Sequence, residues 1–139
     1  MSDREPKRAT TQVRIAGPGG LGHAIAAADA FSEAGRLSAG DAARLAVIVE
    51  ELVANLFDHG GLATAGVATL SLDRAGDIIE LALSDPCPPF DPRTAERSAA
   101  HDARGGGAGI DLVRAWAEFL DYRSDDDGNR LVLRIKLRA

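Results

Sequence analysis

The chain is poor in cysteine and histidine and contains no long hydrophobic run. Its one cysteine, Cys87, cannot form an internal disulfide, which favours a reducing cytoplasm. The three histidines lack the spacing of metal ligands, which argues against a structural zinc site. No apolar run approaches the roughly 20 residues of a membrane helix, and the first residues, MSDREPKR, lack the apolar core of a signal peptide.

An excess of basic charge is also missing. The formal net charge is −5, so we expect neither direct nucleic-acid binding nor attachment to anionic membranes. The 139 residues, 45% hydrophobic and 27% charged, are typical of a globular domain with its own core. We therefore expect a loose N-terminal tail, residues 1–9, followed by a single domain, residues 10–139.

The spacing of apolar residues predicts the elements of this domain. Val13 and Ile15 alternate with polar residues as in a strand, whereas Leu45, Ile48 and Leu52 have the spacing of a helix. By the same rules we expect helices at 23–34, 38–58 and 110–120, and strands at 11–15, 67–73, 77–84, 121–123 and 129–137. This order fits an α/β two-layer sandwich, with helices on one face of a mixed, mostly antiparallel sheet.

Glu51 and Asn55 lie four residues apart in the segment EELVANLFDH, so both side chains share one face of a predicted helix. A carboxylate beside an amide oxygen suits chemistry at a hydrated metal ion, because the oxygen binds the ion and the carboxylate orients or deprotonates a nucleophile. The alternative is that both are solvated residues on an amphipathic helix. The spacing alone does not decide between these interpretations.

Two further features follow downstream. Asp85 continues the inward-facing positions of the strand at 77–84, and a buried carboxylate there needs a partner. The glycines from Gly105 to Gly109 lead into a predicted helix, and a helix N-terminus with exposed N–H groups is a phosphate cradle. No Gly-Lys-Ser/Thr follows, so this is not a Walker A loop, and phosphate binding needs a metal that Asn55 would hold.

A second glycine run has a competing interpretation. Gly17, Gly19 and Gly22 match the G-x-G-x-x-G fingerprint of dinucleotide-binding domains. A strand ending in a ribose-binding acid should then follow within about 30 residues. The only candidate, LAVIVEE, continues without a break into LVANLFDH and is too long for a strand. The simpler interpretation is a loop that leads into the first helix.

In order and spacing, four segments resemble the GHKL ATP-binding fold of gyrase, histidine kinases and MutL. EELVANLFDHG resembles its N-box, SDPCPPFDP its D-x-G-x-P-F-D-P box, GGGAGIDLV its G-x-G-x-x-L/V box, and GNRLVLRIKL its closing strand. Within this fold, the sequence is most similar to the anti-sigma-factor serine kinases of bacterial partner-switching systems. The resemblance covers nearly the whole chain, residues 10–138.

The resemblance implies a role for each matching residue. Glu51 would be the general base that activates the attacking hydroxyl, Asn55 would hold Mg²⁺ at the phosphates of ATP, and Asp85 would bind the adenine amine. Arg104, just before the glycines, would reach the γ-phosphate; the alternative is a solvated lid arginine. The remaining nucleotide-binding residues are Gly105, Gly107, Gly109 and Ile110.

The implied activity is transfer of the γ-phosphoryl group of ATP to a serine or threonine of a STAS-type anti-anti-sigma protein, together with sequestration of a sigma factor, usually by a homodimer. Cys87 departs from the family, which has glycine there. A side chain at this position would crowd the adenine, and Pro86 and Pro88 remove backbone donors. The second hypothesis is therefore a degenerate GHKL module that binds its protein partners without catalysis.

Overall fold

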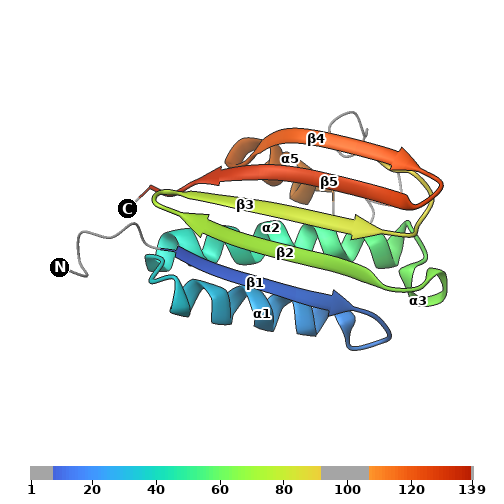
Figure 1. Ribbon diagram of the computed structural model, residues 1–139, viewed down its shortest axis with the longest axis horizontal. Coiled ribbons are helices and arrows are strands. Elements are labelled where there is room, and N and C mark those ends of the chain that lie inside the picture. The colour runs from blue at the N-terminus through green and yellow to red at the C-terminus, as the bar shows by residue number, and fades with distance from the viewer. Residues whose placement is uncertain (1–7, 92–106, 139) are drawn as a thin grey trace.

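The computed structural model of the chain describes residues 8–91 and 107–138. Five strands and four helices follow one another along these residues (Figure 1). The strands are β1 (Arg8–Ile15), β2 (Ala68–Ala75), β3 (Ile78–Asp85), β4 (Glu118–Asp125) and β5 (Gly128–Lys136). The helices are α1 (Gly20–Ala34), α2 (Ala39–Asp58), α3 (Leu62–Ala65) and α5 (Gly107–Trp116).

The strands form one sheet in the order β1-β2-β3-β5-β4, and every neighbouring pair is antiparallel. Helices α1, α2 and α5 lie together on one face of this sheet (Figure 1). The predicted two-layer α/β sandwich is therefore confirmed. The dinucleotide-binding interpretation is wrong, because that fold is built on parallel strands and none of the described strands is parallel to its neighbour.

Helix α2 packs against α1 on one side and α5 on the other. Its apolar stripe, including Leu45, Ile48 and Leu52, is buried as the helical spacing predicted. Ser38 begins the helix, and its hydroxyl accepts a hydrogen bond from the N–H of Asp41 at 3.1 Å, a contact worth about 1 kcal/mol. Among the described residues no helix, α2 included, is long and apolar enough to span a membrane.

The central strands bury one face by simple alternation. Ile79, Leu81 and Leu83 of β3 are buried in the core, and β5 alternates in the same way. Gly76 closes the β2–β3 hairpin at a φ of 64°, a left-handed conformation that favours glycine. Because β3 continues in this register to its last residue, Asp85 emerges on the helix side of the sheet.

Two buried polar side chains hold the ends of elements together. The Asp41 carboxylate accepts hydrogen bonds from the backbone N–H of Arg138 at 3.1 and 3.2 Å and pairs with Arg44 at 2.6 Å. Arg74, on the inward face of β2, donates to the carbonyl of Gly35 just after α1. These bonds connect the start of α2 to the C-terminal end of the chain, and the end of α1 to the sheet.

The predicted N-terminal boundary lies too far along the chain. β1 begins at Arg8, so it starts inside the segment that the sequence assigned to the tail and is longer than the predicted strand at 11–15. Its alternation is as expected, since Val13 and Ile15 point inward and Gln12 outward.

The predicted helix at 110–120 is wrong at its C-terminal end. Helix α5 ends at Trp116, and Glu118 already belongs to β4. The predicted edge strand at 121–123 is thus the middle of a longer one. A β-bulge between Phe119 and Asp121 breaks the period-two alternation at this point. The bulge adds one residue to β4, and this changes the spacing of its apolar residues from the period of a strand to one that resembles a helix.

Candidate functional site

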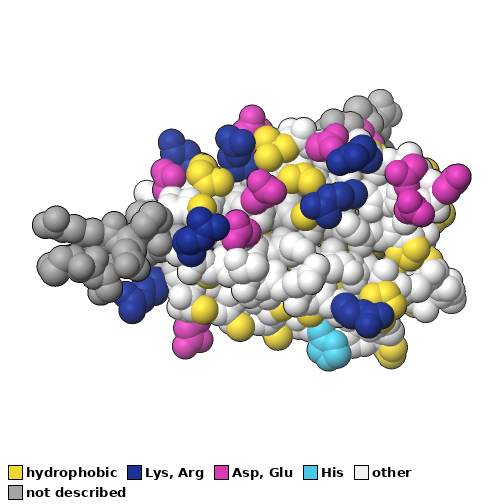
Figure 2. Space-filling view, in the orientation of Figure 1, with side chains coloured by type: hydrophobic (Ala, Val, Ile, Leu, Met, Phe, Trp, Pro, Cys, Tyr) yellow, Lys and Arg dark blue, Asp and Glu magenta, His cyan; other side chains and the backbone are white. Residues whose placement is uncertain are grey.

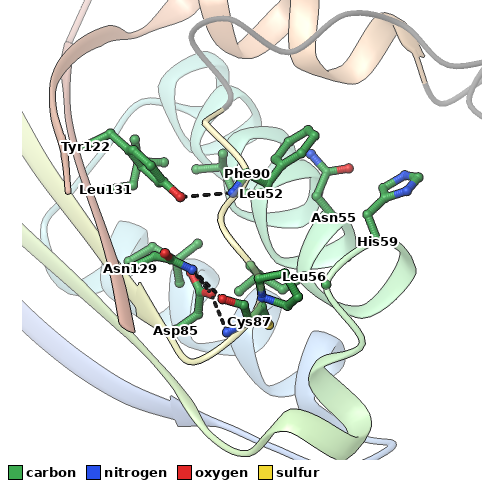
Figure 3. Close-up of a pocket in the computed structure, with 13 residues that line it drawn as sticks. Leu52, Asn55, Leu56, His59, Asp85, Cys87, Phe90, Tyr122, Asn129 and Leu131 are labelled. Carbon is green, nitrogen blue, oxygen red and sulfur yellow. Dashed lines mark hydrogen bonds between the residues drawn. The ribbon is translucent and has the colours of Figure 1, made fainter. Parts of the chain in front are cut away.

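A cavity lies between the C-terminal half of α2, the adjoining ends of β3 and β5, and the segment after β3 (Figure 3). Its volume is about 40 Å³, well below the roughly 300 Å³ of a small ligand pocket. The space between these described residues is therefore smaller than a purine nucleotide needs. The lining residues are Leu52, Asn55, Leu56, His59, Gly60, Leu83, Asp85, Cys87, Pro88, Phe90, Tyr122, Asn129 and Leu131.

Asp85 is held in a defined orientation at the floor of this cavity. Its Oδ1 accepts a hydrogen bond from the backbone N–H of Cys87 and another from the side-chain amide of Asn129, each at 2.9 Å (Figure 3). Both of these bonds end on the same oxygen, Oδ1. A carboxylate can accept about four hydrogen bonds, so Asp85 retains acceptor capacity for a ligand donor such as the amine of an adenine.

Asn129 is a site residue that sequence reasoning missed. It is buried, and its amide nitrogen donates both to Asp85 and to the carbonyl of Cys87, the latter at 2.7 Å. The β3–β5 register places it directly opposite Asp85. A signal was present, because Asn129 has the same parity as the inward-facing Leu131 and Leu133, and a polar residue on that face needs a partner.

The sequence led us to expect that the side chain of Cys87 would crowd the adenine, and Cys87 does line the cavity. It is buried in the hydrophobic core cluster and lies against Gly60, where an added Cβ would come within 2.9 Å of the Cys87 Cβ and Sγ. The N–H of Cys87 is retained as a donor to Asp85. The departure from glycine is therefore accommodated by Gly60, and it preserves a hydrogen bond to the site's carboxylate.

The environment of Cys87 also makes it a poor nucleophile. Burial, and then the negative charge and hydrogen bond of Asp85, raise the pKa of the thiol from 9.0 to about 11. At neutral pH the thiol stays protonated, whereas a reactive cysteine needs a lowered pKa. A redox or nucleophilic role for Cys87 has no support in this geometry.

The acid–amide pair on α2 lies at one side of the cavity. Asn55 lines it, and Glu51 is half-buried one helical turn earlier on the same side of the helix, though it is not among the described lining residues. The described residues contain no cluster of three or more acidic, histidine or cysteine ligands. A metal at this place would depend on Asn55 together with phosphate oxygens and water, which is how Mg²⁺ commonly binds beside nucleotides.

Three of the side chains that line the cavity contact one another. The Tyr122 hydroxyl accepts a hydrogen bond from the N–H of Phe90 at 2.9 Å, and burial raises the pKa of this hydroxyl. The Phe90 ring stacks on His59 at the end of α2, with ring centroids 6.3 Å apart and planes inclined by 13°. Phe90 therefore contacts both Tyr122 of β4 and His59, the residue that follows α2.

The glycine-rich segment is only partly within the described residues. Gly107 and Gly109 lie in the first turn of α5, which packs on α2, and Ile110 is buried. Arg104 and Gly105 lie outside the described residues. The assignment of these five residues to phosphate binding therefore stays a prediction.

Gly128 permits a close approach at the floor of the site. Its φ is 115°, and a Cβ there would lie 2.5 Å from the carbonyl oxygen of Asp85. We expect Gly128→Ala to shift Asp85, to weaken ATP binding and to lower the free energy of unfolding by about 2–4 kcal/mol. Thermal unfolding and ATP titration measure the two effects.

The matched control for this substitution is Gly76→Ala. Gly76 also has a positive φ, 64°, but a Cβ there meets no atom within 4 Å. It should reproduce only the backbone strain, about 1 kcal/mol, and leave ATP affinity unchanged. Equal effects of the two substitutions would show that the contact with Asp85 is unimportant.

The sheet order, the inward carboxylate at the end of β3 and the polar pair on α2 together define a GHKL-type nucleotide-binding domain. Comparison with protein families gives the same result, since residues 16–135 match the family described as histidine kinase-like ATPase domain. The chain belongs to this family and is an ATP-binding domain. A search among curated proteins finds no match to it.

Proposed function

We propose that this domain is an ATP-dependent protein serine/threonine kinase of a partner-switching system. Its substrate is a STAS-type anti-anti-sigma protein, and it also sequesters a sigma factor, acting as a homodimer. The proposal is supported by the resemblance of its four sequence segments to anti-sigma-factor kinases. The observation that carries it is the position of Glu51, one turn before the cavity-lining Asn55 on the same side of α2.

Each side chain then has a defined task. Asp85 accepts a hydrogen bond from the exocyclic amine of adenine, while the N–H of Cys87 and the amide of Asn129 donate to its Oδ1. Asn55 would hold Mg²⁺ through its amide oxygen, and the ion would neutralise phosphate charge. Glu51 takes the proton from the substrate hydroxyl as that oxygen attacks the γ-phosphorus. The bond from the γ-phosphorus to the bridging oxygen breaks, and ADP leaves with its electron pair.

A second candidate is a non-catalytic binding module. It is favoured by the cavity volume of about 40 Å³ and by Phe90 among the lining residues, because a small cavity restricts the access of ATP that phosphoryl transfer requires. Cys87 supports the binding module less than the sequence suggested, since the side chain of Cys87 packs on Gly60. The retained Glu51 favours the kinase, because a scaffold has no use for a general base.

The deciding experiment is a transfer assay with γ-labelled ATP, Mg²⁺ and the STAS protein that co-purifies with the chain from cells. If the chain is a kinase, we expect label on a serine or threonine of that protein, and no label when the acceptor residue is replaced by alanine. Stable binding of the STAS protein or of a sigma factor without any label transfer would leave the binding module.

A further inference from the structure

One face of the sheet is left uncovered by the described helices, since α1, α2 and α5 all lie on the opposite face (Figure 1). Figure 2 looks onto the uncovered face, where basic, acidic and apolar side chains lie over the strands. The register of the strands sorts these side chains into rows that cross the sheet from β1 to β4. Three neighbouring rows differ in charge.

The first of these rows is basic. Its arginines are exposed, and Arg123 lies directly opposite Arg130, an arrangement of like charges that destabilises a sheet. Arg123 pairs with Asp121 at 3.2 Å, whereas Arg14 and Arg130 form no ion pair within the described part of the chain. From β1 to β4, the basic row consists of Arg14, Thr69, Ser84, Arg130 and Arg123.

The next row, the central row, is uncharged and partly apolar. Ala82 is buried although it lies outside the core cluster, and Val132 opposite it is half-buried. Leu120, in the β-bulge beside Val132, is 37% exposed. From β1 to β4, the central row consists of Gln12, Ser71, Ala82, Val132 and Leu120.

The third row is acidic, with three carboxylates and one guanidinium. Asp73 accepts a hydrogen bond from the Thr10 hydroxyl at 2.7 Å, and Arg134 pairs with Glu118 at 3.8 Å. From β1 to β4, the acidic row consists of Thr10, Asp73, Glu80, Arg134 and Glu118. The uncovered face thus has a partly apolar centre with positive charge on one side and negative charge on the other.

We propose that this face binds an amphipathic helix of a partner protein, laid across the strands on the central row. Neighbouring rows are two residues apart, about 7 Å, and a helix with its side chains is about 10–12 Å wide, so its two flanks reach the basic and the acidic row. Charge complementarity selects Asp or Glu on the flank above the basic row and Lys or Arg on the other flank.

The width of the sheet sets the length of this helix. The five strands span about 19 Å from β1 to β4, which corresponds to about 13 helical residues. The helix would also bring an acidic side chain to Arg130, which offsets the repulsion between Arg130 and Arg123. The inference does not rest on phosphoryl transfer, and its test measures peptide binding, so that it and the proposed function can fail separately.

Two labelled synthetic peptides of about 15 residues test the inference by fluorescence anisotropy. The first has a leucine–alanine stripe with glutamates on one flank and lysines on the other; in the second, lysines replace the glutamates. We expect the wild-type chain to bind the first peptide more tightly, although its net charge of −5 favours the more basic second one. Arg130→Glu should weaken binding of the first peptide about tenfold and strengthen binding of the second, because it reverses the charge at the centre of the basic row.

Lys136→Glu is the matched control, because it makes the same change of charge on the same strand and face but lies outside the three rows. It should leave the affinity for both peptides unchanged, and thermal unfolding confirms that both variants are folded. The inference is overturned if the first peptide does not bind at about 1 mM, if Arg130→Glu and Lys136→Glu have equal effects, or if Arg130→Glu does not reverse the preference between the peptides. The face would then be one that is simply solvated, as antiparallel sheets permit.

Discussion

Glu51→Gln is expected to lower the rate of phosphoryl transfer to the STAS protein by about 100-fold or more, while ATP affinity changes little. The amide keeps the shape and polarity of the side chain but cannot accept the proton of the substrate hydroxyl, and a positioned general base contributes 10²–10⁴-fold in typical enzymes. Glu51 is outside the described lining of the cavity, so the nucleotide should bind almost as before. Transfer rates and ATP titrations of the same preparation separate the two effects.

The neighbouring acid supplies the control for this substitution. Glu50 precedes Glu51 on α2 but is exposed on a different side of the helix. Glu50→Gln removes the same charge and should leave transfer unchanged. If both variants lose activity equally, general electrostatics and not a general base explains the result. If Glu51→Gln retains full activity, Glu51 has no catalytic role.

Asp85→Asn is expected to weaken ATP binding by about 10- to 100-fold, the factor expected when a charge-assisted hydrogen bond is lost. The reason lies in the orientation of the carboxylate. Cys87 and Asn129 both donate to Oδ1, so the amide oxygen of the variant should take that place. Its NH₂ group would then face the adenine amine, donor against donor. Calorimetric titration with ATP measures the loss.

The same reasoning predicts a change in specificity. Guanine carries an acceptor oxygen where adenine carries its amine, so Asp85→Asn should lose less affinity for GTP than for ATP. Ser84→Ala serves as the control, because Ser84 is the adjacent residue and lies on the outward face of β3. An unchanged ratio of ATP to GTP affinity in Asp85→Asn would remove Asp85 from adenine recognition.

Much of the fold was predictable because local patterns and global packing agree. Leu45, Ile48 and Leu52 lie on one stripe, a Ser38 cap begins their helix, and that helix is also the one buried at the centre of its layer. The strands β3 and β5 alternate cleanly for the same reason, since each has one face in the core. Where one face of a helix or strand is buried along its whole length, the spacing of apolar residues in the sequence shows the period of that element directly.

The sequence was misleading where structure depends on a partner strand. The segment around Leu120 has helical apolar spacing, but it pairs with β5 through a bulge that no local pattern announces. Asn129 was missed as a site residue for a related reason. It meets Asp85 only because β5 inserts beside β3, and this pairing joins strands that are not consecutive in the chain.

The Cys87 side chain shows a further limit of structure prediction from the sequence. A residue larger than glycine beside the site suggested a steric conflict with adenine, because the sequence gives the size of a side chain but not its direction. The conflict depends on Gly60, 27 residues earlier, which leaves the room that Cys87 occupies. Compensation between distant positions of this kind is visible only once both are placed in space.

The central claim is that Asn55 and Asp85 face one cavity that binds ATP together with Mg²⁺. The most direct measurement is calorimetric titration of the wild-type chain and of Asn55→Ala with ATP, each with Mg²⁺ and with excess chelator. We expect Mg²⁺ to strengthen ATP binding to the wild-type chain and to have no such effect on Asn55→Ala. Equal strengthening by Mg²⁺ in both proteins, or no ATP binding by the wild-type chain, would contradict it.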